Sequence, residues 1–169
     1  EVYVNADVTA RYGRDRDADL LARDNVSAFG DDGIVREGRS RESWDEQCEA
    51  YFTADPYLKP DGLAPTLLDS GVTIGDIESE YDISPTKRDV PTGGRQAAER
   101  RLKSFVDRIR EYQRYVSDPA AAERNGSRLS AYLKFGVVSP REVYQRVHRA
   151  PKCTGRDAFI SRLYWNRHY

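Results

Sequence analysis

The stretch NGSRLSAYLKFGVVSPR, from Asn125 to Arg141, organises the rest of the chain. Ser127 is a good N-cap residue, and a helix that begins at Arg128 would have Ser130 at its third position. Free backbone N–H groups, two hydroxyls and a guanidinium would then converge at one helix end, where the helix dipole favours a phosphate or pyrophosphate. The alternative is two well-capped short helices without a ligand, since serine caps are common.

The second half of the stretch predicts where this short helix ends and the next begins. Gly136 is typical of a residue that closes a helix in the left-handed conformation. Ser139 is followed by Pro140 at the first helical position and by Glu142 three residues on. This order predicts a second helix with a capping box.

Helical periodicity is strong on both sides of these turns. From Gly94, apolar residues recur at alternating spacings of four and three, which predicts one long helix with a buried stripe made of Ala98, Leu102, Phe105, Ile109, Tyr112 and Val116. A loop is expected from Pro119 to Ser127. A last helix, with Thr154 as its cap, is expected to run to Tyr169.

SRLS, then an apolar residue and FG, then SPREV, resembles the flavin phosphate-binding segment of the DNA photolyase and cryptochrome family. The resemblance extends from GGRQAAERRLKSF at Gly93 to FISRLYWNRHY at Tyr169. It implies FAD as cofactor, held through Ser127, Arg128, Leu129 and Ser130.

The resemblance also implies a flavin-contacting tyrosine at the end of the first long helix. Tyr112 has the matching distance to Pro119, and Tyr115 is the alternative. Ordinary core packing is the competing explanation for Tyr112, because this residue lies on the apolar stripe.

Trp165 corresponds to the tryptophan that lies against the flipped pyrimidine dimer in photolyases, so the resemblance implies UV-damaged DNA as partner. An extracted base loses its stacking, and an aromatic face returns about 1–3 kcal/mol per base. A tryptophan buried between helices is the alternative. Arg162 stands where repair enzymes tend to carry a glutamate, Asn166 where arginine is common, and His168 where an aromatic is usual. A guanidinium cannot replace a carboxylic acid, since it is permanently charged and only donates.

The net charge of −1 is the sum of two regions with opposite net charge. Residues 1–90 carry 10 basic and 21 acidic side chains, a net charge of −11, whereas residues 91–169 carry 17 basic and 7 acidic ones, a net charge of +10. A basic region of this size predicts a polyanionic partner such as DNA. Its alternative is a solvated helical surface that docks onto the acidic region.

The expected fold class is α/β followed by all-α. Residues 1–55 are expected to form the C-terminal part of a Rossmann-like parallel α/β antenna domain, with strands at Glu1–Asn5 and Ile34–Val35 and helices at Arg14–Asp24 and Ser40–Thr53. Residues 56–91, rich in proline, are expected to be an interdomain linker with a short helix near Pro65–Ser70. Residues 92–169 are expected to be the N-terminal part of a helical FAD-binding domain. By resemblance, the antenna domain implies a second chromophore of unknown identity.

Other features narrow the class of protein. No apolar run is long enough for a membrane helix, and Cys48 and Cys153 match no metal spacing, so a cytoplasmic monomer without a metal is expected. The absence of methionine and of a stop signal before Tyr169 predicts a piece of a longer chain, which alone would bind FAD weakly or not at all. Neither a P-loop nor GxGxxG occurs.

The sequence is compatible with three alternative functions. The first is a photolyase in which light-excited reduced FAD passes an electron to a pyrimidine dimer. The second is a cryptochrome-like FAD photoreceptor without repair activity, towards which Arg162 tilts the balance. The third is a basic helical DNA-binding module without flavin.

Overall fold

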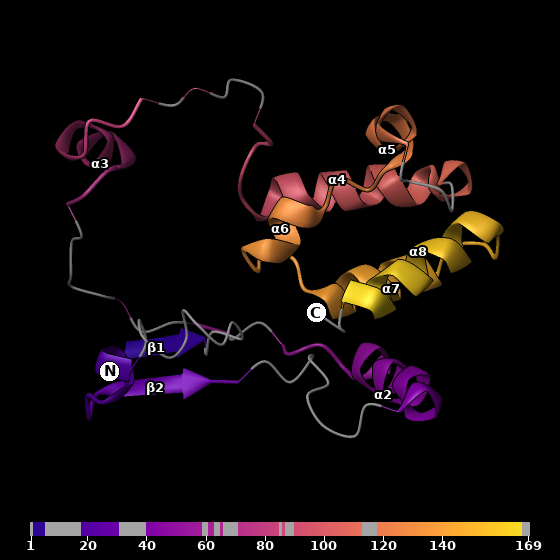
Figure 1. Ribbon diagram of the computed structural model, residues 1–169, viewed down its shortest axis with the longest axis horizontal. Coiled ribbons are helices and arrows are strands. Elements are labelled where there is room, and N and C mark those ends of the chain that lie inside the picture. Colours follow the sequence, from indigo (N-terminus) through magenta and orange to yellow (C-terminus); the bar gives the residue numbers. More distant parts are fainter. Residues whose placement is uncertain are drawn as a thin grey trace.

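The computed structural model describes most of the helical half of the chain and parts of the first half. The described residues are 2–5, 18–30, 40–58, 61–62, 65, 71–84, 86, 90–112 and 118–166. In these ranges the chain is mostly helical, with one small parallel sheet (Figure 1). This agrees with the coarse expectation of an α/β part followed by an all-α part.

The sheet has two described strands, β1 (Val2–Asn5) and β2 (Val26–Phe29), which pair in parallel with Val2 opposite Val26. The expected first strand is confirmed, and β2 was not predicted. The sequence of β2 lacks the apolar alternation that marks a half-buried strand. This agrees with the structure, in which most residues of β2 are exposed. The expected strand at Ile34–Val35 and the first residues of the helix expected at Arg14–Asp24 lie outside the described residues.

Helix α2 (Arg41–Thr53) is the predicted one. Ser40 is its N-cap, since the Ser40 hydroxyl accepts a 3.0 Å hydrogen bond from the Ser43 amide. Helix α3 (Ile74–Glu80) was not predicted. The Thr73 hydroxyl and the Asp76 carboxylate form a reciprocal capping box that starts it, although none of its residues is buried. The expected helix near Pro65–Ser70 lies outside the described residues except for Pro65.

Helix α4 (Arg95–Asp107) carries the predicted stripe: Ala98, Leu102 and Phe105 are buried. The helix was expected to continue to Val116, but it ends nine residues earlier. The chain tightens there, because the Arg108 amide bonds to the Phe105 carbonyl and a 3₁₀ turn, η1 (Ile109–Glu111), follows. Tyr112 is then extended.

The prediction of a loop from Pro119 to Ser127 is wrong for Pro119–Asn125, which is helical. Residues Pro119–Asn125 form helix α5, started by the Asp118 carboxylate, which accepts from the amides of Ala120 and Ala121 at 2.9 and 3.4 Å. Asp118 and Pro119 are a typical N-cap and first helical residue, so the signal was present in the sequence.

Helix α6 (Ser130–Lys134) ends as predicted at Gly136, whose φ is +63°. The Gly136 amide bonds to the Leu133 carbonyl, and the Val137 amide bonds to the Tyr132 carbonyl at 2.8 Å, which together form a Schellman motif. Helix α7 (Pro140–His148) has Ser139 as its N-cap and proline at its first position, as predicted. The other half of the expected capping box does not form, because the Glu142 carboxylate pairs with Arg95 at 2.6 and 2.7 Å.

Helix α8 (Thr154–Asn166) completes the helical bundle. Its Phe159 and Leu163 join a single apolar core with α4 and α7, and α2 contributes Cys48 and Phe52 to the same core. The Phe52 ring stacks on Tyr144, with centroids 4.8 Å apart, and on Tyr164, with centroids 5.5 Å apart.

Two side chains of α7 fix α2 in this position. The Arg141 guanidinium donates to the carbonyls of Tyr51 and Asp55 at 2.8 and 3.2 Å. The Gln145 amide donates to the carbonyls of Phe52 and Ala54 at 3.2 and 2.9 Å. These carbonyls lie at the C-terminus of α2, where the helix itself supplies no donors. The end of the region 1–55 is therefore joined tightly to the region 92–169.

Candidate functional site

The Ser127–Ser130 segment differs from the expected capped helix. Helix α6 begins at Ser130 with Leu129 as its N-cap residue, so the prediction that Ser127 caps a helix starting at Arg128 is wrong. Arg128 has a φ of +54°, in the left-handed region, which interrupts right-handed helical geometry at this residue. The Ser127 hydroxyl instead accepts a 3.4 Å hydrogen bond from the Leu129 amide, and the Leu129 side chain is fully buried.

Arginines surround this segment and anchor it on α4. The Arg101 guanidinium donates to the Ser127 carbonyl at 2.9 Å and to the Gly126 carbonyl at 3.3 Å. Burial lowers the pKa of Arg101, and the positive charges of Arg108 and Arg128 lower it further. Three guanidinium groups therefore lie near the segment, and two of them are paired with carboxylates, Arg108 with Glu111 and Arg128 with Glu123.

The predicted phosphate donors do not all converge. The Arg128 guanidinium turns back towards α5, where it donates to the Glu123 carbonyl at 3.2 Å and pairs with the Glu123 carboxylate at 3.3 Å. Ser130 is exposed. Among the described residues, no acceptor bonds to the backbone amides of Ser130, Ala131 and Tyr132, the first three residues of α6.

Tyr112 and Arg162 are brought together from the two ends of the helical region. Tyr112 is only 8% exposed and packs edge-on against Phe105 and Phe159. Burial raises the pKa of Tyr112, and the positive charge of the nearby Arg162 opposes this rise. A residue expected at the flavin and a residue expected at the lesion are therefore neighbours, although the core packing of Tyr112 is also observed.

Trp165 and Arg162 line one groove on the outer face of α8. This groove has a volume of about 450 Å³ and is also lined by Thr154, Asp157, Ala158 and Ser161. The Trp165 side chain is 54% exposed, so it is not the tryptophan buried between helices that was considered as the alternative. Asn166 is the last residue of α8, and its side chain lies outside the described residues. Ser127, Leu129 and Ser130 do not line this groove.

Gly155, which was not predicted as a functional residue, lets α8 approach η1 and Tyr112 closely. A Cβ atom at this position would overlap the Ile109 carbonyl oxygen and would lie 3.0 Å from the Tyr112 carbonyl oxygen. Glycine is thus required by the approach of two backbones. Its position at the start of the last predicted helix, where glycine is unfavourable, was the available signal.

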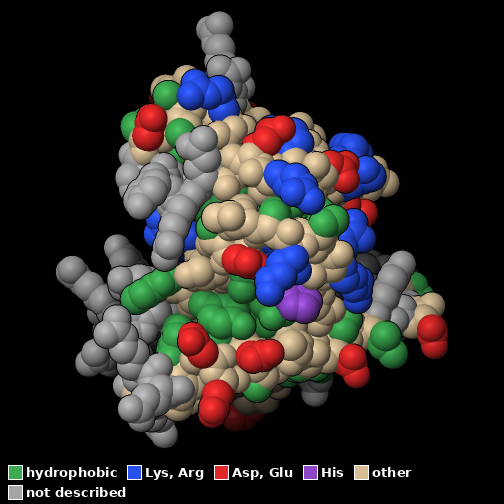
Figure 2. All heavy atoms as spheres, turned by 90° about the vertical axis from the view of Figure 1, so that its right-hand side faces the viewer, with side chains coloured by type: hydrophobic (Ala, Val, Ile, Leu, Met, Phe, Trp, Pro, Cys, Tyr) green, Lys and Arg blue, Asp and Glu red, His purple; other side chains and the backbone are tan. Residues whose placement is uncertain are grey.

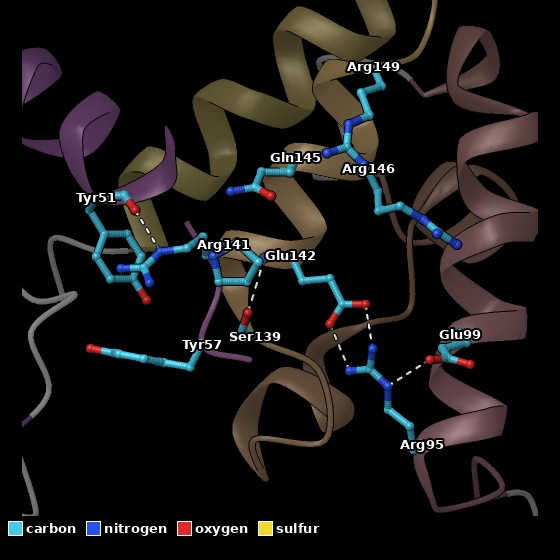
Figure 3. Close-up of a pocket in the computed structure, with 11 residues that line it drawn as sticks. Tyr51, Tyr57, Arg95, Glu99, Ser139, Arg141, Glu142, Gln145, Arg146 and Arg149 are labelled. Atoms are coloured by element: carbon cyan, nitrogen blue, oxygen red, sulfur yellow. Dashed lines mark hydrogen bonds and ion pairs between the residues drawn. The ribbon is translucent and has the colours of Figure 1, made fainter. Parts of the chain in front are cut away.

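A larger groove of about 890 Å³ was also missed (Figure 3). It lies among the end of α2, the start of α4 and the outer face of α7, and four arginines line it: Arg95, Arg141, Arg146 and Arg149. Three of these arginines come from α7 and its C-cap, and Arg95 comes from α4, so the groove forms only where the two helices pack together.

The surface reflects the charge division of the sequence. On the face drawn in Figure 2, lysine and arginine side chains lie in the upper and middle parts together with several acidic ones, and the lowest part shows acidic side chains without basic ones. Helix α2, which lies at the bottom of the molecule in Figure 1, exposes Asp45, Glu46 and Glu49. The region after residue 90 therefore presents the basic surface that was expected.

Comparison of the chain with protein-family models, with curated proteins and with solved structures found no match. Within the described ranges, no cluster of three or more histidine, cysteine or acidic side chains could hold a metal ion. None of the described helices combines the length and the apolar character that crossing a bilayer requires. Cys48 is buried, Cys153 is half-buried, and neither forms a disulfide.

Proposed function

We propose that this protein is a flavin-dependent blue-light DNA photolyase, with an antenna domain of Rossmann-like type at its N-terminal end and a helical FAD-binding domain after it. FAD would be bound by the Ser127–Ser130 segment and Tyr112. A pyrimidine dimer in UV-damaged DNA would be bound at Arg162, Trp165 and Asn166. The proposal rests first on the resemblance of Gly93–Tyr169 to this family.

The observation that carries the proposal is the proximity of Tyr112 to Arg162: the Tyr112 ring packs on Phe159, three residues before Arg162 in α8, and the charge of Arg162 acts on the pKa of Tyr112. These residues are 50 positions apart, and the resemblance assigns one to the flavin and the other to the lesion. An electron can pass from a cofactor to a substrate only over a short distance, so the two sets of residues must adjoin in such an enzyme. Their proximity therefore supports the proposal.

The residues have separable tasks. Reduced FAD, once excited by light, supplies the electron that splits the dimer. The basic segment around Ser127 would hold the diphosphate, and the free amides at the start of α6 would donate to its oxygens. The exposed Arg128 side chain would leave Glu123 to join them, at small cost because this ion pair is largely solvated. Trp165 would return stacking to an extrahelical base through its open face.

A cryptochrome-like photoreceptor without repair activity is the second candidate, and Arg162 favours it. Arg162 lies near Tyr112 and lowers the pKa of this tyrosine by its positive charge. A permanently charged donor also cannot supply the proton that a carboxylic acid would give to a dimer radical anion.

The test of the flavin site is a titration of FAD into the protein, followed by the ³¹P NMR signals of the diphosphate. This readout detects binding into the millimolar range. The double variant Ser127→Ala/Arg128→Ala should weaken binding by about ten- to a hundredfold, because a charge-assisted contact is lost. The control Ser104→Ala/Arg100→Ala removes the same two side-chain types from exposed positions on α4 and should bind as the wild type.

Equal ³¹P shifts in the wild type and in the Ser127→Ala/Arg128→Ala variant would contradict the assignment of the flavin site. Once flavin is bound, blue light and dimer-containing DNA separate the two candidates. Loss of dimers supports the photolyase, and flavin photoreduction without loss of dimers supports the photoreceptor.

A further inference from the structure

Helix α3 is closed at both ends by its own residues, although none of them is buried. The Thr73 and Asp76 side chains form the capping box at its start. At its end, Asp82 has a left-handed φ of +50°, and the Ile83 amide donates to the Glu78 carbonyl at 2.9 Å, as in a Schellman motif. A helix of this length is marginal in water, because most helical stability in proteins comes from the packing of an apolar face. Helix α3 therefore needs a surface on which to pack.

The side chains of α3 indicate what kind of surface this is. Ile74, Ile77 and the C-cap residue Tyr81 recur at spacings of three and four, so they form one apolar stripe, and they are 76%, 43% and 67% exposed. The segment 71–84 carries four acidic side chains and no basic one. An acidic helix with an open apolar stripe fits a groove that is partly apolar and positively charged.

The larger groove has both of these properties. Tyr51 and Tyr57 lie at one end of it (Figure 3), and Tyr57 is 87% exposed. With four arginines and two glutamates, the groove carries a formal charge of +2. Arg146 and Arg149 are exposed, and neither side chain makes a hydrogen bond or an ion pair with another described residue. These two guanidinium groups are therefore available to an acidic partner.

The arrangement of these side chains favours an elongated occupant. The Tyr57 ring lies at the opposite end of the groove from Arg146 and Arg149, whose guanidinium groups point in different directions (Figure 3). One small ligand cannot reach all three side chains. A helix presents apolar and acidic side chains on successive turns, so it can meet them separately.

The chain connects α3 to this groove from both sides. Tyr57 and Arg95 line the groove, and α3 lies between them in the sequence. Residues 58–73 and 81–94 are the two connections, and an extended chain of about 15 residues spans up to about 50 Å. In Figure 1, α3 lies away from the bundle, so docking would be a second arrangement of the same chain. The tether raises the effective concentration of α3 at its own groove above that at the groove of a second copy.

We propose that α3 docks in the larger groove of its own chain, with its apolar stripe at the tyrosine end and its carboxylates towards Arg146 and Arg149. Docked in this way, α3 would cover the groove and offset its excess positive charge. The interaction does not depend on flavin binding.

The test is paramagnetic relaxation enhancement in the full chain. A nitroxide is attached to Ser79→Cys, at an exposed position of α3 outside the apolar stripe, in a Cys153→Ser background; Cys48 is buried. A nitroxide broadens the NMR signals of nearby amides only. If α3 docks as proposed, the amide signals of Tyr57 and Arg146 should broaden.

Exchange of charges tests the position of α3. Arg146→Glu/Arg149→Glu should abolish the broadening, because like charges then face each other. Addition of Glu78→Arg/Glu80→Arg to this variant should restore it. Such a rescue would not be expected if the first substitutions had only disturbed α7.

The controls separate docking from other causes. Ile77→Asp should abolish the broadening, because a charge then interrupts the apolar stripe. Arg100→Glu/Arg110→Glu reverses the same number of charges at exposed positions outside the groove and should leave the broadening unchanged. A mixture of spin-labelled protein with ¹⁵N-labelled protein lacking the nitroxide detects contact between copies. Absence of broadening in the single chain, equal broadening in this mixture, or an equal loss in Arg100→Glu/Arg110→Glu would each overturn the proposal.

Discussion

The Nε of Arg141 donates a 2.8 Å hydrogen bond to the carbonyl oxygen of Tyr51, 90 residues earlier in the chain, and the same guanidinium lies over the Tyr51 ring. Arg141 belongs to the SPRE motif that starts α7. This residue therefore serves as the donor that α2 lacks at its C-terminus. The segment expected to bind flavin phosphate and the segment expected to end the antenna domain are thus joined through one side chain of α7.

Replacement of Arg141 should release α2 from the bundle. Arg141→Ala removes two charge-assisted hydrogen bonds and a buried cation–π contact, so we expect a loss of about 2–4 kcal/mol in the free energy of unfolding. Arg141→Lys should recover only part of it, because an ammonium cannot reproduce the planar fork. Urea unfolding measures the loss. Arg146→Ala, at an exposed position of the same helix, should change the free energy of unfolding by less than about 0.5 kcal/mol. An equal loss in Arg146→Ala would contradict the role of Arg141 in holding α2.

Enlargement of Gly155 should separate α8 from η1. The added methyl group in Gly155→Ala would overlap the Ile109 carbonyl oxygen, and relief of this contact should cost about 1–3 kcal/mol. Gly93→Ala is the control, since a Cβ atom there meets nothing within 4 Å. Urea unfolding of both variants decides the point. A wild-type stability for Gly155→Ala would show that the two backbones do not approach as closely as described.

Arg128 tests whether strain is stored in the flavin segment. Its φ of +54° is disfavoured for residues with a Cβ atom, so Arg128→Gly should be about 1 kcal/mol more stable than Arg128→Ala. Both variants lose the guanidinium, so both should also lose affinity for FAD diphosphate if the proposed function is correct. Thermal unfolding gives the first difference, and the ³¹P titration gives the second. Equal melting temperatures for the two variants would mean that residue 128 is not left-handed in solution.

Two tyrosines should make the protein sensitive to alkali. Burial raises the pKa of Tyr112, and burial together with a hydrogen bond to Tyr144 raises the pKa of Tyr164. The unfolded state ionises near pH 10, before the folded state does, so stability is retained below this pH and falls as the pH rises above it. Each tyrosine contributes a slope of at most about 1.4 kcal/mol per pH unit. Urea unfolding at pH 9, 10 and 11 should give a smaller decline of the free energy of unfolding for Tyr112→Phe/Tyr164→Phe than for wild type, and an equal decline would contradict this prediction.

Local rules predicted the parts of the fold that local chemistry governs. Ser40, Ser139 and Gly136 end or begin helices as their types indicate, and the apolar stripe of α4 is buried. These features depend on residues within one turn of each other, which a sequence displays directly. The same local rules were available for α5, where Asp118 and Pro119 were not recognised as a helix start.

The features that were missed depend on residues distant in the sequence. The bend after Asp107 follows from the packing of η1 against Gly155 and not from any breaker in α4. The start of α6 moved by two residues, because Leu129 is buried and Arg128 is left-handed. The expected capping box at Ser139 is incomplete, because Arg95, 47 residues earlier, offers Glu142 a bidentate partner.

The packing of α2 on the bundle also predicts the effect of cleaving the chain between Leu58 and Val90. Phe52 and Cys48 are sealed in the apolar core, and Arg141 and Gln145 hold the last carbonyls of α2. Cohesion between this helix and the bundle therefore comes from contacts in space and not from the peptide bonds between Leu58 and Val90. Two separately produced polypeptides, 1–58 and 90–169, should therefore reassemble when mixed.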